Sequence, residues 1–254
     1  MEKLMFNLNE GLIRTIFPNG GVIEVAWHFY AVYLAFALGT ILIAYLLGSI
    51  NSAIIISKVL YRDDIRRHGS GNAGLTNMHR TYGGKAAILT LVGDIAKTAI
   101  AVCIAGVLFG FNYVGGVSTG DGFCYVAGLF AMLGHIFPIY YKFKGGKGVL
   151  VSATMGLILS PIPFLLVFLV FVIMVTLTKY VSLGSVSGAV LYPVIMHGYF
   201  AAVMSAKTPG LVSLSCIILA IVIVWCHRGN LQRISDRTER KLSFKKKKND
   251  DENE

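Results

Sequence analysis

Hydrophobic residues run along this chain in long blocks, and short polar segments separate them. The blocks cover residues 27–58, 86–110, 122–141, 149–160, 162–178, 184–204 and 210–226. A helix needs about 20 mostly apolar residues to cross the hydrocarbon core of a bilayer, and most of the blocks approach or exceed that length. The pattern therefore predicts an all-α polytopic membrane protein with seven transmembrane helices.

The block at 149–160 is the shortest, and it ends at the sequence Ser160-Pro161. At a rise of 1.5 Å per residue, a helix of this length extends only about 18 Å, which is less than the hydrocarbon thickness. The sequence leaves open whether this segment crosses the bilayer or enters it and returns on the same side.

Basic residues favour seven crossings, because Lys and Arg concentrate in cytoplasmic loops. With seven spans, the opposite side carries only Lys3, Arg14 and Lys207, and the basic tail lies in the cytoplasm. The bases of the connecting segments on the cytoplasmic side are Lys58, Arg62, Arg66, Arg67, Arg80, Lys85, Lys142, Lys144, Lys147 and Lys179. If the short block at 149–160 does not cross, the chain has six spans, and the basic tail would lie on the extracytoplasmic side. We therefore expect the N-terminus outside and the C-terminus in the cytoplasm.

Composition agrees with a membrane location, since 55% of the 254 residues are hydrophobic and only 14% are charged. Loops and tail account for the net charge of +10, so no nucleic-acid partner is expected. We divide the chain into an extracytoplasmic segment without a signal peptide at 1–26, a membrane domain at 27–242 and a charged, disordered tail at 243–254. Four cysteines without paired or metal-type spacing are expected to be buried free thiols: Cys103, Cys124, Cys216 and Cys226.

The first polar segment, residues 64–85, reads DIRRHGSGNAGLTNMHRTYGGK. Its glycines let backbone amides approach a ligand, and its small polar side chains add donors without bulk, which suits an anion. The spacing of Gly69, Gly71 and Gly74 also matches a dinucleotide-binding pattern, with Asp94 20 residues further on. That motif requires a preceding hydrophobic strand, and DDIRRH is not one. A connector that binds no ligand remains an alternative.

The second segment, residues 135–149, reads HIFPIYYKFKGGKGV. Its GGKG sequence precedes an apolar helix, so successive N–H groups and the Lys147 ammonium surround a small volume that could hold phosphate oxygens. Gly148 follows Lys147 where a nucleotide-hydrolysing loop has Ser or Thr, so nucleotide hydrolysis has no support. Taken alone, these lysines could equally serve only to orient the protein.

The third segment, residues 226–242, leaves the last block, and His227 and Asn230 share one face of the predicted helix. Within the blocks, Asp94 and Lys97 lie three positions apart, and mutual neutralisation near the interface is the simpler interpretation of this pair. Ser182 and Ser185 begin the sixth span on the cytoplasmic side, where a hydroxyl could reach a site formed by the three segments.

Three anion-binding segments on one face of a membrane predict a composite site for phosphate chemistry at the lipid surface. A transporter or channel is a competing hypothesis, but no span shows the paired, broken halves of an inverted repeat. A metal-dependent phosphotransferase needs carboxylates for Mg²⁺, and the cytoplasmic loops supply only Asp63 and Asp64. We expect no metal and no cofactor.

The motifs GSGNAGLTNMHR, GHIFPIYYKFKGGKGV and HRGNLQRI occur in that order over residues 40–242. Together with YLLGSI at 45–50 and DIAK at 94–97, they resemble the bacterial acyl-phosphate-dependent glycerol-3-phosphate acyltransferases. The resemblance implies a seven-helix fold in the bacterial inner membrane, with the active site at the cytoplasmic face. It also implies a reaction in which acyl phosphate and glycerol-3-phosphate give 1-acylglycerol-3-phosphate (lysophosphatidic acid) and inorganic phosphate, the first acylation of phospholipid synthesis.

The resemblance also assigns roles to residues. Glycerol-3-phosphate is expected to bind Ser70, Asn72, Thr76 and Arg80, and the amides of the GGKG segment are expected to hold the phosphate of the acyl donor. The expected catalytic residues are Ser70, Asn72, Arg80, His227 and Asn230, and the expected substrate-binding residues are Thr76, Lys147, Ser185, Gly145, Gly146 and Gly148. Either a phosphate oxygen of a substrate or His227 could remove the proton of the attacking hydroxyl.

Some positions depart from the family pattern. No histidine has an aspartate five residues later, which excludes the HxxxxD mechanism of other acyltransferases. Val151 stands where a threonine is usual, and the alternation of helix faces argues against compensation by Ser152. The further departures are Leu75, Leu150, Gly229 and Arg237. These changes bear on substrate affinity more than on the type of reaction.

Overall fold

The computed structural model describes residues 26–110, 113–114, 117–118 and 122–242, and these residues are almost entirely helical. The predicted segments 1–26 and 243–254 therefore lie almost wholly outside the described residues. The longer helices are α2 (Ala26–Ser49), α3 (Ser52–Tyr61), α5 (Gly84–Phe109), α6 (Phe123–Ile136), α7 (Val149–Leu159), α8 (Pro161–Thr178), α9 (Val181–Ala202) and α10 (Gly210–Cys226). The shorter elements are η1 (Ile65–Arg67), α4 (Leu75–Tyr82), η2 (Ile139–Tyr141), α11 (Arg228–Ser235) and the strands β1 (Tyr113–Val114) and β2 (Val117–Ser118).

Each of the seven predicted blocks is helical, but the first is broken. It forms α2 and α3, which are separated at Ile50 and Asn51. Asn51 caps α3, because its side-chain oxygen accepts a hydrogen bond from the backbone N–H of Ile54 at 3.1 Å. Hydropathy alone does not reveal this break, since apolar residues continue on both sides of it.

Five of the described helices or continuous helix pairs are long and apolar enough to cross a membrane. The bent pair of α10 and α11, with an angle of 51° between its parts, makes a sixth. The seventh block forms α7, whose 11 residues extend only about 16 Å. The structure thus shows an almost entirely helical membrane protein, while seven crossings and the orientation of the termini remain predictions.

The helices form a bundle with α6 at its centre. Ten residues of α6 are buried, and α6 packs against α2, α5, α7 and α10. Glycines allow close approach: a Cβ at Gly48 of α2 would lie 2.1 Å from the carbonyl oxygen of Ala131, and one at Gly134 of α6 would lie 2.2 Å from that of Tyr45. Small residues at helix contacts are typical of membrane bundles, where close backbone packing drives association.

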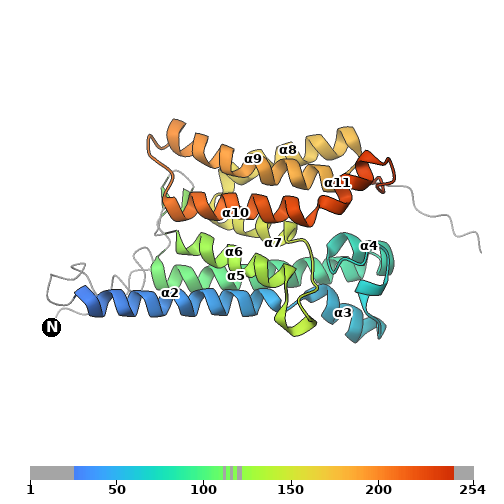
Figure 1. The fold of residues 1–254 in the computed structure, drawn as a ribbon, viewed down its shortest axis with the longest axis horizontal. Helices are drawn as coiled ribbons and strands as arrows, with labels where there is room; N and C mark the ends of the chain where they lie inside the picture. The colour runs from blue at the N-terminus through green and yellow to red at the C-terminus, as the bar shows by residue number, and fades with distance from the viewer. Residues whose placement is uncertain (1–25, 111–112, 115–116, 119–121, 243–254) are drawn as a thin grey trace, which may run out of the picture.

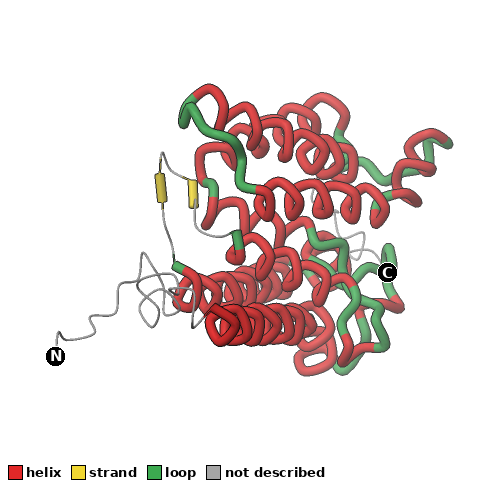
Figure 2. Tube along the Cα trace, turned by 60° about the vertical axis from the view of Figure 1, so that its left-hand side comes forward, coloured by secondary structure: helices red, strands yellow, loops and turns green. Residues whose placement is uncertain are grey.

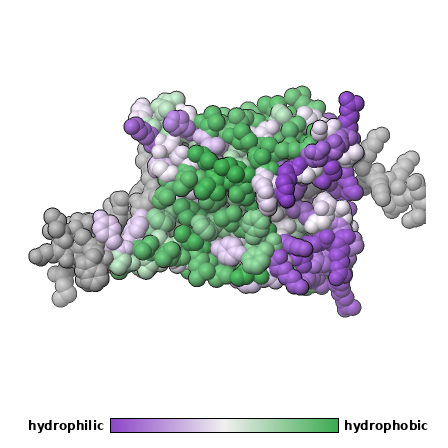
Figure 3. Space-filling view, viewed as in Figure 1, coloured by the Kyte–Doolittle hydropathy of each residue, from purple (hydrophilic) through white to green (hydrophobic). Residues whose placement is uncertain are grey.

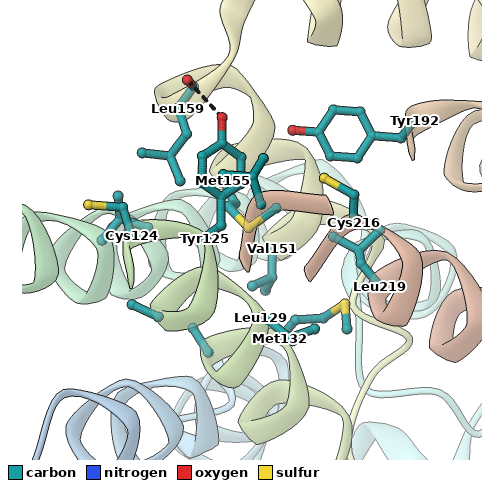
Figure 4. Packing of buried hydrophobic residues seen from close by; sticks show 14 of the residues in the cluster. Cys124, Tyr125, Leu129, Met132, Val151, Met155, Leu159, Tyr192, Cys216 and Leu219 are labelled. Atoms are coloured by element: carbon teal, nitrogen blue, oxygen red, sulfur yellow. Dashed lines mark hydrogen bonds between the residues drawn. The ribbon is translucent and has the colours of Figure 1, made fainter. Parts of the chain in front are cut away.

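The second half of the bundle consists of α8, α9 and α10, which lie above α2, α5 and α6 in Figure 1. Met155 of α7 and Cys216 and Leu219 of α10 join the two halves in the core (Figure 4). Two tyrosines hold the end of α7, since Tyr125 donates a hydrogen bond to the carbonyl of Leu159 at 3.2 Å and the hydroxyls of Tyr192 and Ser160 are 2.6 Å apart. The four cysteines are free, but only Cys124 and Cys216 are buried as predicted, since Cys103 is exposed and Cys226 is half-buried.

Polar and apolar surfaces are separated along the bundle. Figure 3 shows a hydrophobic band around the middle and a concentration of hydrophilic residues at the end that carries α3, α4 and α11 in Figure 1. The two short antiparallel strands, with Val114 opposite Val117, lie at the other end (Figure 2). The three polar segments of the sequence therefore meet at one end of the molecule.

Candidate active site

A cavity of about 430 Å³ opens among the three polar segments and continues between the helices. Its polar part includes Ser70, Asn72, Thr76, Arg80, Lys147, Ser182, Ser185, His227 and Asn230. Its apolar part includes Val149, Leu150, Ala153, Phe164, Val167, Phe168, Phe171, Tyr192, Leu219 and Ile223. Residues far apart in the sequence thus surround one space, as the composite site requires.

The segment before α4 is held in shape by the buried side chain of Asn77. Its oxygen accepts the backbone N–H of Ser70 at 3.0 Å, and its nitrogen donates to the carbonyls of His68 at 2.9 Å and Asn72 at 3.0 Å. Gly69 has a φ of 60°, and a Cβ there would lie 2.1 Å from the Asn77 oxygen, so only glycine fits. This turn presents Ser70 and Asn72 to the cavity.

Thr76 and Arg80 follow on α4, four positions apart on one face of the helix. Arg66 fixes the same segment to the second one, because its guanidinium donates to the carbonyls of Tyr141 at 2.9 Å and Lys144 at 3.2 Å. Asp64 pairs with Arg66, and the hydrogen bonds from Arg66 lower the pKa of Asp64 to about 2. The glycine-rich segment is therefore a rigid structural unit and not a loose connector.

The GGKG segment corrects one expectation. The amide of Gly145 donates to the carbonyl of Ile136 at 3.1 Å, and that of Gly146 donates to the carbonyl of His135 at 3.0 Å. Neither amide is free to hold a phosphate in this conformation, and neither glycine lines the cavity. The close backbone approach explains these glycines, since a Cβ at Gly145 would lie 2.1 Å from the His135 oxygen.

The amides available for an anion lie slightly later in the chain. Gly148 has a φ of 79° and forms the N-cap of α7, so its backbone and the first turn of α7 border the cavity. The first N–H groups of a helix have no partner within the helix and carry a partial positive charge. Val151 is buried in the core, whereas Ser152 lines the cavity, which is the reverse of what alternation suggested.

The third segment is tied to the second through Asn230. Its side-chain oxygen accepts a hydrogen bond from the Lys147 ammonium, and its nitrogen donates to Glu239 at 2.6 Å. Glu239 also accepts hydrogen bonds from Ser182 at 3.0 Å and Arg233 at 2.8 Å. One carboxylate thus joins α9 and α11, and through Asn230 it reaches Lys147.

His227 ends α10 with a buried ring, and its Nδ1 lies 2.8 Å from the carbonyl of Ile223. A carbonyl only accepts, so Nδ1 carries the hydrogen and Nε2 is left as an acceptor. Burial and the nearby Lys147 ammonium lower the pKa of His227 to about 4. Burial also lowers the pKa of Lys147, although Glu239 opposes this effect.

Sequence reasoning overlooked several residues at this site. Asp94 and Lys97 do form an ion pair, with 2.8 Å between Lys97 Nζ and Asp94 Oδ1, but His135 joins them and both Asp94 and His135 line the cavity. Glu239 and Arg240 line it as well. Arg237 has a φ of 58°, a left-handed conformation that glycine adopts most readily, which explains why glycine is the expected residue there. Nothing in the structure explains the arginine.

Comparison with known proteins places this site in a family. Residues 38–237 match the family model described as glycerol-3-phosphate acyltransferase. A glycerol-3-phosphate acyltransferase of Coxiella burnetii is 42% identical over 208 residues, which cover 81% of this chain and 97% of that protein. One of Bacillus subtilis is 37% identical over 207 residues, covering 80% and 96% of the two chains.

Solved structures agree with the sequence comparisons. The glycerol 3-phosphate form of PlsY, an integral membrane glycerol 3-phosphate acyltransferase, has a TM-score of 0.70 and is 32% identical, covering 82% of this chain and 96% of that one. Its lysophosphatidic acid form has a TM-score of 0.68 and is 31% identical, covering 82% and 95%. The family match covers the first two segments that surround the cavity and residues 226–237 of the third. The chain therefore belongs to the glycerol-3-phosphate acyltransferase family of integral membrane enzymes.

Proposed function

We propose that this enzyme transfers a fatty acyl group from acyl phosphate to the 1-hydroxyl of glycerol-3-phosphate, which yields lysophosphatidic acid and inorganic phosphate. The observation that carries the proposal is the single cavity, whose polar end has basic groups and whose other end is apolar. Such a shape fits a donor with a phosphate head and a hydrocarbon tail. Its polar end lies beside the hydrophilic end of the bundle, where a soluble acceptor can enter.

The two phosphates fit separate parts of the polar end. Lys147, Gly148 and the first turn of α7 surround the space next to the apolar part, which suits the phosphate of the donor. Arg80 and the hydroxyl and amide groups of Ser70, Asn72 and Thr76 line the same polar end from the first segment and α4, which suits glycerol-3-phosphate. This arrangement brings the hydroxyl of the acceptor beside the carbonyl of the donor.

The apolar part lies between α7, α8, α9 and α10 and suits the acyl chain. Gly184 and Gly188 of α9 keep it open opposite the rings of α8, and a Cβ at Gly184 would lie 3.0 Å from a ring carbon of Phe171. Tyr192 and Gly156 lie farther along the same helices, where a Cβ at Gly156 would lie 3.5 Å from the Tyr192 hydroxyl. The tail can thus remain among apolar side chains while the head reacts.

Catalysis in this site depends on position and charge. Acyl phosphate is a mixed anhydride with a good leaving group, so alignment of the hydroxyl and stabilisation of the departing phosphate can supply much of the acceleration. Attack forms the ester bond, breaks the bond from carbonyl carbon to phosphate oxygen, and releases inorganic phosphate. His227 is a weak base, because its pKa is about 4. A substrate phosphate oxygen, with a second pKa of about 6, is better matched to take the proton.

For His227 we propose an orienting role, in which Nε2 accepts a hydrogen bond from the attacking hydroxyl. Asn230 holds Lys147 in place, and Ser185 adds a hydroxyl next to the donor phosphate. We further propose that the chain crosses the inner membrane of a bacterium seven times, with the C-terminus and the cavity entrance at the cytoplasmic face. This orientation is supported by the basic segments at the hydrophilic end. The reaction as written needs neither a metal nor a cofactor.

The test uses the purified protein in detergent, with glycerol-3-phosphate and either acyl phosphate or acyl-CoA as donor, and without added metal. We expect lysophosphatidic acid and phosphate in equal amounts from acyl phosphate, and no product from acyl-CoA. Phosphate release that does not depend on glycerol-3-phosphate would contradict the proposal. Equal rates with acyl-CoA would assign a different donor.

A further inference from the structure

His135 lies beside the proposed donor phosphate, in contact with a buried lysine. The Lys97 ammonium is 2.9 Å from the carbonyl oxygen of Ile50, 2.8 Å from Asp94 Oδ1 and 2.9 Å from His135 Nδ1. An ammonium group has three hydrogens to donate and no lone pair to accept with. Lys97 therefore donates one hydrogen bond to each partner, and His135 Nδ1 is an acceptor.

This contact determines where the hydrogen of the imidazole lies. In a neutral ring one nitrogen is the donor and the other is the acceptor. Because Nδ1 accepts from Lys97, the hydrogen of His135 is on Nε2. Asp94 does not alter this result, since its Oδ1 lies 3.6 Å from His135 Nδ1 and accepts hydrogen bonds from Lys97 and from Ser52 at 3.0 Å. His135 thus has a defined tautomer with an Nε2–H group.

No residue that the structure describes accepts a hydrogen bond from this Nε2–H group, and Nε2 is not among the described side-chain atoms that are fully buried without a partner. His135 is 3% exposed and lines the cavity, so this donor is left to face the cavity. The ring is held against Gly146, where a Cβ would lie 2.0 Å from His135 Nε2. The same two residues are joined by the hydrogen bond from the Gly146 amide to the His135 carbonyl. The donor is therefore fixed next to Lys147 and Gly148.

His227 has the opposite arrangement in the same cavity. Its Nδ1–H is directed to the Ile223 carbonyl, which leaves Nε2 as an acceptor. His135 thus presents a donor on the side of the second segment, and His227 presents an acceptor on the side of the third. A phosphate oxygen requires donors, and an attacking hydroxyl requires an acceptor.

We propose that His135 binds the acyl donor through a hydrogen bond from Nε2–H to a phosphate oxygen, and that Lys97 and Asp94 are positioning residues which fix its tautomer. This inference rests on the proposed function for the identity of the ligand. A bond of this kind joins a neutral donor to a charged acceptor, and such bonds are stronger than neutral pairs. The developing charge on the leaving phosphate strengthens it further during the reaction.

The tautomer is tested first, because it does not depend on activity. The probe is wild-type protein labelled with ¹⁵N-histidine, with His135→Gln and His227→Gln used to assign the two signals by NMR. We expect a hydrogen on Nε2 of His135 and on Nδ1 of His227. A hydrogen on Nδ1 of His135 would overturn the inference. In Lys97→Met, the His135 signal should lose its fixed tautomer while that of His227 is unchanged.

The ligand is tested with two substitutions at the same position. His135→Met removes the donor, whereas His135→Gln can place an amide N–H near the position of Nε2. We expect His135→Met to raise the KM for acyl phosphate about 10- to 100-fold and to leave the KM for glycerol-3-phosphate within about twofold. His135→Gln should recover at least a third of the lost affinity. Thermal stability of each variant in detergent checks the fold.

Two results would contradict the assignment. An unchanged KM for acyl phosphate in a folded His135→Met protein would remove His135 from the site, and a rise only in the KM for glycerol-3-phosphate would assign it to the other phosphate. If wild-type protein releases no phosphate from the two substrates, the proposed function fails. The NMR experiment would still determine the tautomer of His135, because it does not depend on activity.

Discussion

The two walls of the cavity entrance are held together in different ways. On the side of α4, the Asn77 side chain bonds to backbone groups, and none of these bonds depends on an ionised group. On the side of α11, contacts run between side chains and converge on the Glu239 carboxylate. The Asn77 contacts of the first wall should therefore resist changes of pH and salt, although the Arg66–Asp64 ion pair lies in the same segment. The contacts of the second wall depend on the charge of Glu239 at the edge of the membrane.

The largest effect is expected on the first wall, from Asn77→Ala. This change leaves buried carbonyls and one N–H without partners, at a cost of about 1 to 3 kcal/mol for each group. We expect kcat/KM to fall more than about 100-fold and the thermal midpoint to drop. His79→Ala, on the exposed part of the same helix, is the matched control and should behave as wild type. Nearly normal activity of Asn77→Ala would show that this wall tolerates loss of its central contact.

A smaller loss is expected on the second wall, from Glu239→Gln. Burial acts to raise the pKa of Glu239, but hydrogen bonds from Asn230, Arg233 and Ser182 outweigh this and hold it below the usual value of 4.5. We expect kcat/KM to fall about 30-fold, because a hydrogen bond to a charged group contributes about 1.5 to 3 kcal/mol. Asp236→Asn is the control, because Asp236 is exposed, contacts Gln232 and does not line the cavity.

The sign of the Glu239 effect can also be tested with pH. A lowered pKa stabilises the folded state above the unfolded value near 4.5, and this contribution is lost as the pH falls through the lower folded value. Wild-type thermal stability should therefore decline in acid more steeply than that of Glu239→Gln. Parallel pH curves for the two proteins would show that the carboxylate does not hold the second wall through its charge.

The sequence identified most residues that line both walls of the cavity, but it did not show the contacts that hold these residues in place. Apolar blocks and basic connections indicated a membrane bundle with its polar segments at one end, and the motif residues do line one cavity. The small polar side chains of residues 64–85, Asn77 among them, were interpreted only as possible anion donors, because nothing in the local sequence shows that the Asn77 amide faces four backbone groups. The contacts of Glu239 and His135 join residues distant in the sequence, so they depend on packing that periodicity does not reveal.

The structure of the second segment shows the same limitation. Two glycines before Lys147 looked like phosphate-binding residues, but their amides bond to the end of α6. Glycine is needed there because other backbone and a histidine ring lie too close for a Cβ. A glycine can serve to bind a ligand through its backbone or to allow close packing within the chain. The sequence is the same in both cases, and only the structure distinguishes them.

A moderate effect is expected in the apolar part of the cavity. In Gly156→Val, added methyl groups meet Phe164 and Tyr192 and shorten the space for an acyl chain. We expect the kcat/KM ratio of long to short acyl phosphates to fall about 10-fold, since overpacking of this size costs about 1 to 3 kcal/mol. Gly198→Val, at a position with no atom within 4 Å of a Cβ, is the control. An unchanged chain-length preference would place the acyl chain elsewhere.

The smallest expected effect is on the shape of the pH–rate profile in His227→Gln. With a pKa of about 4, His227 stays neutral across the working range, so the wild-type profile should show no titration near the ordinary histidine value of 6.5. The fall in rate below about pH 6 should belong to a substrate phosphate and should persist in the variant. If the substitution abolishes an inflection near 6.5, His227 is the base.

The break between α2 and α3 couples two features that look independent in the sequence. It leaves the Ile50 carbonyl without a helical partner, and Lys97 from another helix supplies the missing hydrogen bond. An unbroken helix would leave this buried lysine with one acceptor fewer, and a broken helix without the lysine would leave the carbonyl without this hydrogen bond. A design that reuses this fold must therefore retain both the helix break at Ile50 and the Lys97 side chain.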